Sequence, residues 1–455
     1  MTAPVTPPPR GALASLFEQV RERIAGEGVT GSAFRSFVVN VGGAGISFIG
    51  QVILARALGE AGFGVYLLAL ACMNAASVLA KMELDGTSTR FLAGYIGAEQ
   101  WGHARGYSTW SRRMVRWTSL GVASLGVAIA WFWRDDFARK HEALPAALMV
   151  VCGLLVMNAQ MLLNSSHLQA LKRYVQSQVP GLILRPALLA TTVGLWILLG
   201  TTPTPAQVIA INLVATTSAV FLLQYWLRRA RPAELTRAPM AFEKTRWISA
   251  AKGLVTIGIA QLVISQQSDL IVVGWLVGAK ETGLYGAAAQ FTLLLQFGQT
   301  SISFVAAPLI AELHEQKNYV RLQHLVRQVF VANAAIGLPI LAILVAFGHL
   351  LLRWSYGPAF EAAYPVLVIL SIAITTAALV GATAGFLLTM TEYQREAAWI
   401  IGGSAVLNLM LTLILTPMYG LIGTAIATLC ATLARSGVLV WFIRRRMGLS
   451  VFPWA

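Results

Sequence analysis

The stretch from Ser265 to Gln290 reads SQQSDLIVVGWLVGAKETGLYGAAAQ, and it resembles an earlier stretch from Gln51 to Ala71, QVILARALGEAGFGVYLLALA. In both stretches an apolar run ends, the chain turns and a second apolar run begins. The matched residues are 219 positions apart (278 − 59) in a chain of 455, which is close to half its length. The offset predicts one helical unit that is used twice. The alignment pairs Gly59 with Gly278, Gly64 with Gly283, and Tyr66 with Tyr285.

The composition places this repeat in a membrane. Hydrophobic residues make up 57% of the chain, charged residues only 12%, and the mean hydropathy is +0.67. A soluble domain does not carry so much apolar sequence, and a spanning helix needs about 20 apolar residues. We therefore expect an all-α polytopic membrane protein with twelve transmembrane helices, in two six-helix repeats that face a central groove. The twelve apolar segments lie near residues 36–57, 63–83, 113–133, 143–163, 180–200, 205–227, 250–277, 284–310, 328–348, 363–387, 396–416 and 420–442.

These segments divide the chain into five parts. Residues 1–35 form a Pro-rich cytoplasmic tail, in which a short apolar face predicts either an interfacial helix on the membrane surface or a solvated segment. Residues 36–230 form an N-lobe of spans 1–6, and residues 248–446 form a C-lobe of spans 7–12. A basic cytoplasmic linker, residues 231–247, joins the lobes, and residues 447–455 form a second cytoplasmic tail.

The distribution of Lys and Arg predicts the orientation in the membrane. With the N-terminus inside, 28 of the 34 basic residues lie on the inner side and 6 on the outer side. Basic loops concentrate on the cytoplasmic side, so both termini are expected in the cytoplasm of a bacterium, with the chain in its inner membrane. The net charge of +15 then indicates loops held at the inner leaflet and no nucleic-acid partner. Three basic residues inside or beside spans lie within reach of that inner surface: Arg185, Lys252 and Arg435.

Polar side chains follow one face of the second span. Their gaps of three and four residues place them on one side of a helix: Asn74, Ser77, Lys81, Asp85 and Ser88. The eighth span carries a second polar stripe at the corresponding place: Gln296, Gln299, Thr300 and Ser303. Matching stripes predict two walls of one substrate-binding groove. The alternative is that they make contacts between helices, with Lys81 reaching the inner surface beside Asp85.

The first and seventh spans supply the remaining groove candidates. Asn40 and Gln51 lie in the first span, and Gln266 lies in the seventh. Asp269 precedes a long apolar run, so it is not at a helix end. An intramembrane carboxylate is costly and therefore a functional candidate, here for binding a proton or cation that couples transport, or else for a structural hydrogen bond.

Several longer strings resemble a known family. They are Tyr356–Phe360 (YGPAF), Ala363–Leu367 (AYPVL), Thr416–Ala425 (TPMYGLIGTA), and Gly86, Arg90 and Phe91 after the second span. Together they resemble the polysaccharide transporter family, whose bacterial members are Wzx-type O-antigen flippases. That family belongs to the multidrug/oligosaccharidyl-lipid/polysaccharide exporter superfamily.

The resemblance implies a function. It implies a flippase that moves an undecaprenyl-diphosphate-linked oligosaccharide from the cytoplasmic to the periplasmic leaflet by alternating access, for lipopolysaccharide and other surface polysaccharides. It implies membrane lipids and polysaccharide polymerase or export proteins as partners, no cofactor and no metal, and a place for Arg90 in the loading groove. The sequence contains no GxxxxGK[ST] motif that would hold ATP.

Two other classes remain open. A multidrug or cation exporter of the same superfamily would share the fold and repeat, but it would favour acids over bases in the groove. A membrane glycosyltransferase or ligase would want acidic residues in an outer loop, for which only Asp135 and Asp136 qualify. The repeat has no natural place in such an enzyme, so a non-enzymatic transporter is expected.

Overall fold

The computed structural model describes residues 29–264, 266–316, 318–389, 393–448 and 450, and the regular elements in these ranges are all helical. The predicted surface helix of the first tail and most of residues 447–455 lie outside them. The first half contains α2 (Val29–Lys81), α3 (Leu84–Gly97), α4 (Trp101–Phe132), α5 (Arg134–Lys140), α6 (Leu144–Ala170), α7 (Tyr174–Val179), η1 (Pro180–Leu184), α8 (Arg185–Leu198), α9 (Pro205–Ala230) and α10 (Ala233–Arg237).

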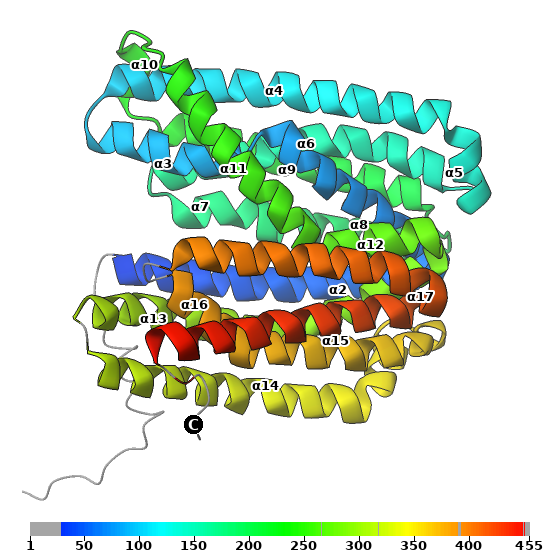
Figure 1. The fold of residues 1–455 in the computed structure, drawn as a ribbon. Coiled ribbons are helices and arrows are strands. Elements are labelled where there is room, and N and C mark those ends of the chain that lie inside the picture. The colour runs from blue at the N-terminus through cyan, green and yellow to red at the C-terminus, as the bar shows by residue number, and fades with distance from the viewer. Residues whose placement is uncertain (1–28, 265, 317, 390–392, 449, 451–455) are drawn as a thin grey trace, which may run out of the picture.

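The second half follows the same plan. Figure 1 shows its later helices gathered below the α3–α9 group, with part of α2 between the two groups. The elements are α11 (Lys244–Ile264), α12 (Gln266–Leu276), α13 (Ala279–Glu315), α14 (Tyr319–Ser355), η2 (Pro358–Ala363), α15 (Tyr364–Thr376), η3 (Ala377–Ala382), α16 (Thr383–Thr389) and α17 (Gln394–Met447).

The helices are long and apolar enough to cross a membrane. Eight stretches among the described residues qualify by length and hydropathy, and two of them, 38–81 and 395–447, have 44 and 53 residues. About 20 residues suffice for one crossing, so each of these two is long enough for two. Each is broken by a glycine with positive φ, at Gly59 (φ 66°) and Gly420 (φ 58°). The all-α membrane architecture is confirmed, and the count of twelve crossings stays a prediction.

The repeated glycines bring the two halves together. Gly59 and its partner Gly278 (φ 146°) both have positive φ, which only glycine adopts readily. A methyl group on Gly64 would collide with the backbone carbonyl of Ala279, and one on Gly283 would collide with that of Glu60. The paired residues 64 and 283 therefore pack backbone to backbone where α2 crosses α13. This reciprocal contact is what a two-fold repeat requires.

Further contacts between the halves lie near Gly59, at the end that the charge pattern predicts to be outer. Glu60 forms an ion pair of 2.7 Å with Lys280, and Arg56 donates hydrogen bonds to the carbonyls of Ser355 (2.6 Å) and Trp354. From α12 onwards, the second half meets the first chiefly through α2. The seam is filled by three rings with centroids about 6 Å apart, those of Phe63, Tyr356 and Phe360.

The linker at the opposite end is docked on the first half. The Ala241 amide donates to the Gly102 carbonyl over 3.0 Å, and the Trp247 indole donates to the Tyr95 hydroxyl over 3.0 Å. That hydroxyl donates to Glu243 (2.7 Å), and this bond, assisted by Arg246, lowers the pKa of the Glu243 carboxyl. The carboxyl therefore stays ionised at neutral pH.

Candidate functional site

An acid cluster lies in the second half around the repeated Tyr285. Asp269, on α12, is only 3% exposed, and it accepts a hydrogen bond of 2.8 Å from the Tyr285 hydroxyl on α13. Two residues of α17, on either side of its break, complete the cluster: Asn408 donates to one carboxylate oxygen (3.4 Å) and Thr428 to the other (3.1 Å). Four predicted spans thus converge on one carboxylate.

Two polar atoms beside this cluster have no hydrogen-bond partner. The side-chain oxygens of Asn408 and of Thr412, one helical turn further along α17, are both buried and unsatisfied within the described part of the chain. A buried unpaired oxygen is costly, and such atoms in a native structure indicate an unseen water or ion. The acid cluster therefore offers carboxylate, amide and hydroxyl oxygens, which are the ligands that hard cations prefer.

A base cluster lies at the equivalent place in the first half, around Tyr66. The Tyr66 hydroxyl accepts a hydrogen bond from Asn212 over 3.4 Å. Arg185 donates through Nε to the Asn212 side-chain oxygen (2.9 Å) and through Nη1 to that of Asn158 (3.2 Å). No described carboxylate forms an ion pair with Arg185. The guanidinium is therefore held between interior asparagines and does not simply extend to the inner surface, as the sequence suggested.

Local sequence positions the base cluster. The π-helical turn η1 ends at Leu184, and α8 begins at Arg185 with a proline in its first turn; such irregular turns often mark functional sites. Helix α9 begins at a capping box: the Gln207 amide donates to the Thr204 hydroxyl (3.4 Å), and the Thr204 amide donates to the Gln207 side chain (2.8 Å). Further along α9, Asn212 is buried, and its side chain bonds Arg185 and Tyr66.

The two clusters have the same plan and opposite charge. Each surrounds one tyrosine of the repeated pair, and each draws on several helices of its own half. The first is centred on Arg185 and the second on Asp269. Sequence reasoning found Asp269 and missed the role of Arg185. The signal that could have found it was an asparagine in each of two predominantly apolar spans, Asn158 and Asn212.

The predicted Lys81 lies in a local ion cluster. Its ammonium is 3.0 Å from Glu83 and 2.9 Å from Asp85, and the second Asp85 oxygen is buried without a partner. Met82 and Glu83 have φ values of 49° and 50°, so the helix breaks between α2 and α3 and turns the Glu83 carboxylate back. A phosphate that binds Lys81 would compete with these two acids.

The other described groove residues make separate contacts with different partners. Asn74 donates to Gln267 of α12 over 3.3 Å, and the Ser77 hydroxyl bonds the Asn74 carbonyl in its own helix. The exposed Asn40 contacts Gln178 over 3.3 Å. The exposed Arg90 lies over the neighbouring Phe91 ring, the Gln51 side-chain oxygen is buried without a partner, and Gln296 is half-buried. The side chains of Gln266, Gln299 and Thr300 lie outside the described set.

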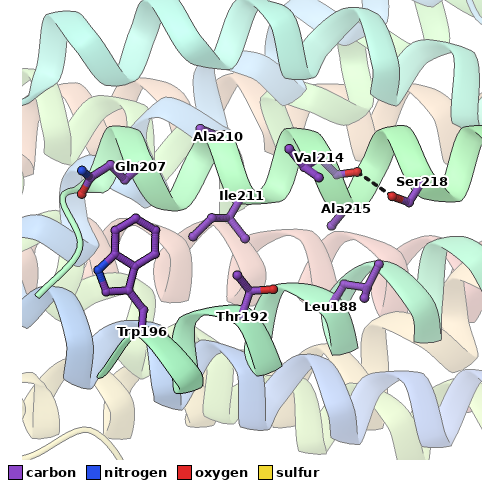
Figure 2. A pocket seen from close by; sticks show the side chains of 9 residues that line it. All are labelled: Leu188, Thr192, Trp196, Gln207, Ala210, Ile211, Val214, Ala215 and Ser218. Carbon is purple, nitrogen blue, oxygen red and sulfur yellow. Dashed lines mark hydrogen bonds between the residues drawn. The ribbon is translucent and has the colours of Figure 1, made fainter. Parts of the chain in front are cut away.

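A pocket lies elsewhere, between α8 and α9. It encloses about 440 Å³ and is almost entirely apolar; Figure 2 shows Trp196 and Gln207 at one end and Ser218 at the other. None of the predicted groove residues lines it. Since the lining residue Val214 is largely exposed, the pocket opens on the side of the bundle. It suits a hydrocarbon chain better than a sugar.

Two protein-family models match parts of the chain. The family described as polysaccharide biosynthesis protein matches residues 29–314, and the MatE family matches residues 256–414. No curated protein sequence is matched by the chain.

Solved structures match nearly the whole chain at low identity. An inward-facing multidrug resistance MATE transporter of the MOP superfamily is 14% identical, with 89% of this chain and 94% of that one covered and a TM-score of 0.73. The lipid II flippase MurJ, in an inward closed conformation, is 14% identical, with 90% and 87% covered and a TM-score of 0.65. A MOP superfamily transporter from Pyrococcus furiosus is 13% identical, with 92% and 95% covered and a TM-score of 0.59. The chain thus shares the fold of these membrane proteins, and it belongs to the polysaccharide biosynthesis protein family, whose model matches more than half of it.

Proposed function

We propose that the protein is a flippase for an undecaprenyl-diphosphate-linked oligosaccharide, which it carries from the cytoplasmic to the periplasmic leaflet of the bacterial inner membrane for surface polysaccharide synthesis. The observation that carries the proposal is Arg185, a cation held inside a membrane bundle with no described carboxylate paired to it. A charged side chain in a span costs about 3 kcal/mol on insertion scales, so it is kept where function needs it. An anionic substrate needs such a charge, whereas a cationic drug would be repelled by it.

The substrate would load from the inner leaflet. Lys81 and Arg90 lie near the end that the charge pattern predicts to be cytoplasmic, where a lipid diphosphate enters. The stripe from Asn74 and Ser77 to Lys81 and Asp85 would form one wall of the groove, with Gln296, Gln299 and Thr300 on the other and Asn40, Gln51 and Gln266 between them. The lipid tail would remain among acyl chains beside the bundle. Polymerase or export proteins would then take over the flipped product.

The acid cluster would couple this transfer to a cation or proton. Asp269, Asn408, Thr412 and Thr428 belong to α12 and both arms of α17, so a bound cation would tie these helices together. Binding at one site shifts a conformational equilibrium only if the ion binds the two states with different affinity. That condition is met if these helices separate between the two states, because the cluster would then lose oxygen ligands. Coupling by ion binding agrees with the absence of a P-loop from the sequence.

Transport in proteoliposomes with lipid-linked oligosaccharide tests both clusters. Arg185→Gln should weaken substrate binding tenfold or more, since a charge-assisted hydrogen bond contributes roughly 1.5–3 kcal/mol. Asp269→Asn should leave binding largely intact and abolish the dependence of transport on the ion gradient. The matched control is Arg435→Gln, because Arg435 is half-buried and belongs to neither cluster. If Arg185→Gln binds and transports like the parent protein, the flippase assignment loses its main support.

A multidrug or cation exporter is the second candidate. The buried Asp269 favours it, as does the match of the MatE family to residues 256–414. The two functions differ in the charge of the substrate. Proteoliposomes that move organic cations against a gradient, lose this activity in Asp269→Asn and keep it in Arg185→Gln would favour the exporter. Transfer of sugar by the purified protein would instead indicate a glycosyltransferase.

A further inference from the structure

A cluster of arginines lies at the linker end of the first half, away from the site described above. Arg112 and Arg116 belong to α4, and Arg231 follows the last residue of α9. The positive charges of Arg116 and Arg231 both act on Arg112, and that of Arg228 acts on Arg231. Burial and this like charge lower the pKa of Arg231. We call Arg112, Arg116 and Arg231 the arginine pocket.

No described acid neutralises the arginine pocket. None of its members forms an ion pair among the described residues. Arg112 is half-buried and donates only to Ser108 of its own helix, over 3.0 Å to the carbonyl and 2.8 Å to the hydroxyl. Arg112 and Arg231 are half-buried and Arg116 is exposed, and their like charges repel each other, so an anion bound between them would relieve this repulsion.

A buried histidine beside the arginines has one ring nitrogen without a hydrogen-bond partner among the described residues. His167, near the end of α6, is fully buried, and the charges of Arg112 and Arg231 both act on it. Its Nε2 atom contacts the Ser111 hydroxyl at 3.3 Å, while its Nδ1 atom has no hydrogen-bond partner in the described structure. The imidazole thus supplies an additional unsatisfied group beside the arginines.

The pocket lies at the depth of lipid headgroups. Trp117, next to Arg116, is 67% exposed, and Tyr225 of α9 is 47% exposed with Arg229 lying over its ring at 4.7 Å. Exposed Trp and Tyr beside Arg mark the boundary between hydrocarbon and headgroups. After α9 the chain enters α10, which packs on α4, so the ends of α4, α6 and α9 meet here. Helix α4 takes no part in the main contact between the halves, and its exposed Trp117 lies on a face that lipid would cover.

We propose that the arginine pocket binds the phosphate of an anionic phospholipid of the inner leaflet. The guanidinium fork matches two phosphate oxygens, and basic pockets between helices on the cytoplasmic side bind such headgroups. The headgroup depth favours a lipid over a soluble phosphate. This site is independent of the flippase substrate, because it holds no residue of either cluster or of the groove.

The test compares two double variants of the full chain, purified in detergent and stripped of lipid. Arg112→Gln with Arg231→Gln removes the pocket, and Arg113→Gln with Arg237→Gln removes two exposed charges from the same side. Native mass spectrometry and thermal unfolding then measure binding of phosphatidylglycerol, with phosphatidylcholine and inorganic phosphate as comparison ligands. The pocket variant should bind phosphatidylglycerol about tenfold more weakly than the parent, and the control should lose less than threefold.

Two outcomes would overturn the proposal. The first is equal phosphatidylglycerol binding by the pocket and control variants, and the second is protection of the parent by phosphate as strong as that by the lipid. The double variant Arg112→Lys with Arg231→Lys controls for misfolding, because it keeps both positive charges and loses only the forked guanidinium geometry. It should keep part of the affinity and the parent's unfolding midpoint in phosphatidylcholine.

Discussion

At the scale of single residues, the molecule places a cation and an anion at equivalent sites of a repeated fold. Tyr66 and Tyr285 occupy matching positions, yet Arg185 lies near the first and Asp269 beside the second. An isolated charge in an apolar interior is unfavourable, and each is held by amide or hydroxyl groups that satisfy it. The fold is therefore symmetric while its electrostatics are not, and a charged substrate would sense the two halves differently.

Lys81 permits a sharper test now that its partners are known. Lys81→Arg should retain most binding of the lipid-linked substrate, because arginine keeps the positive charge that can pair with a diphosphate and with Glu83 and Asp85. Lys81→Gln alone leaves two unpaired carboxylates, so any loss would have two causes. The combination of Lys81→Gln, Glu83→Gln and Asp85→Asn removes the whole ion cluster without leaving an unpaired charge.

If Lys81 binds substrate, this triple variant should lose binding by roughly tenfold, as expected for removal of one charge-assisted contact. Equilibrium binding of the lipid-linked oligosaccharide in detergent provides the measurement, and thermal unfolding verifies that the variant is folded. Full binding by the triple variant would show that Lys81 serves only to join α2 to α3.

At the scale of helices, the repeat could be predicted from sequence because the matched residues lie where one apolar run ends and the next begins. Gly59 and Gly278 mark positive-φ turns, and Gly64 with Gly283 allow close packing of backbones. The base cluster could not be predicted in the same way. Its members come from α6, α8 and α9. The periodicity of one segment does not indicate which face of another segment it will contact. Glu83 joins Lys81 only because the backbone turns left-handed between α2 and α3.

The crossing of α2 and α13 leads to a stability prediction. Gly64→Ala and Gly283→Ala should each destabilise the protein by about 1–3 kcal/mol, because the methyl group meets a backbone carbonyl that cannot move alone. The double variant should cost less than the sum, since one separation of the helices relieves both collisions. Chemical unfolding of the purified protein gives these values. Gly121→Ala in α4, where the methyl group meets nothing, should be neutral or slightly stabilising; an equal loss there would refute the packing argument.

At the scale of the whole molecule, the contacts near Gly59 suggest a seam that must open during transport. There the halves are joined by one ion pair, a few hydrogen bonds, three rings and the close packing of Gly64 against Gly283, while the linker packs on the first half and α11 contacts both halves. Under alternating access, a groove that is open to the inner side must close on that side and open at this seam. A covalent link across the seam should therefore hold the protein in one state and stop turnover.

This prediction uses Glu60→Cys with Lys280→Cys, in a chain whose native Cys72, Cys152 and Cys430 are replaced. A cleavable bifunctional thiol reagent should abolish transport of lipid-linked oligosaccharide in proteoliposomes, and reduction should restore it. The control is Asp136→Cys with Arg139→Cys, a pair one turn apart within α5, which should react without loss of transport. Because Lys280 is exposed and Glu60 is only half-buried, the substitutions themselves should change stability by no more than about 1 kcal/mol. Undiminished transport by fully linked protein would mean that the two halves do not separate at this end, and that the substrate crosses without the rocking motion that the repeat suggests.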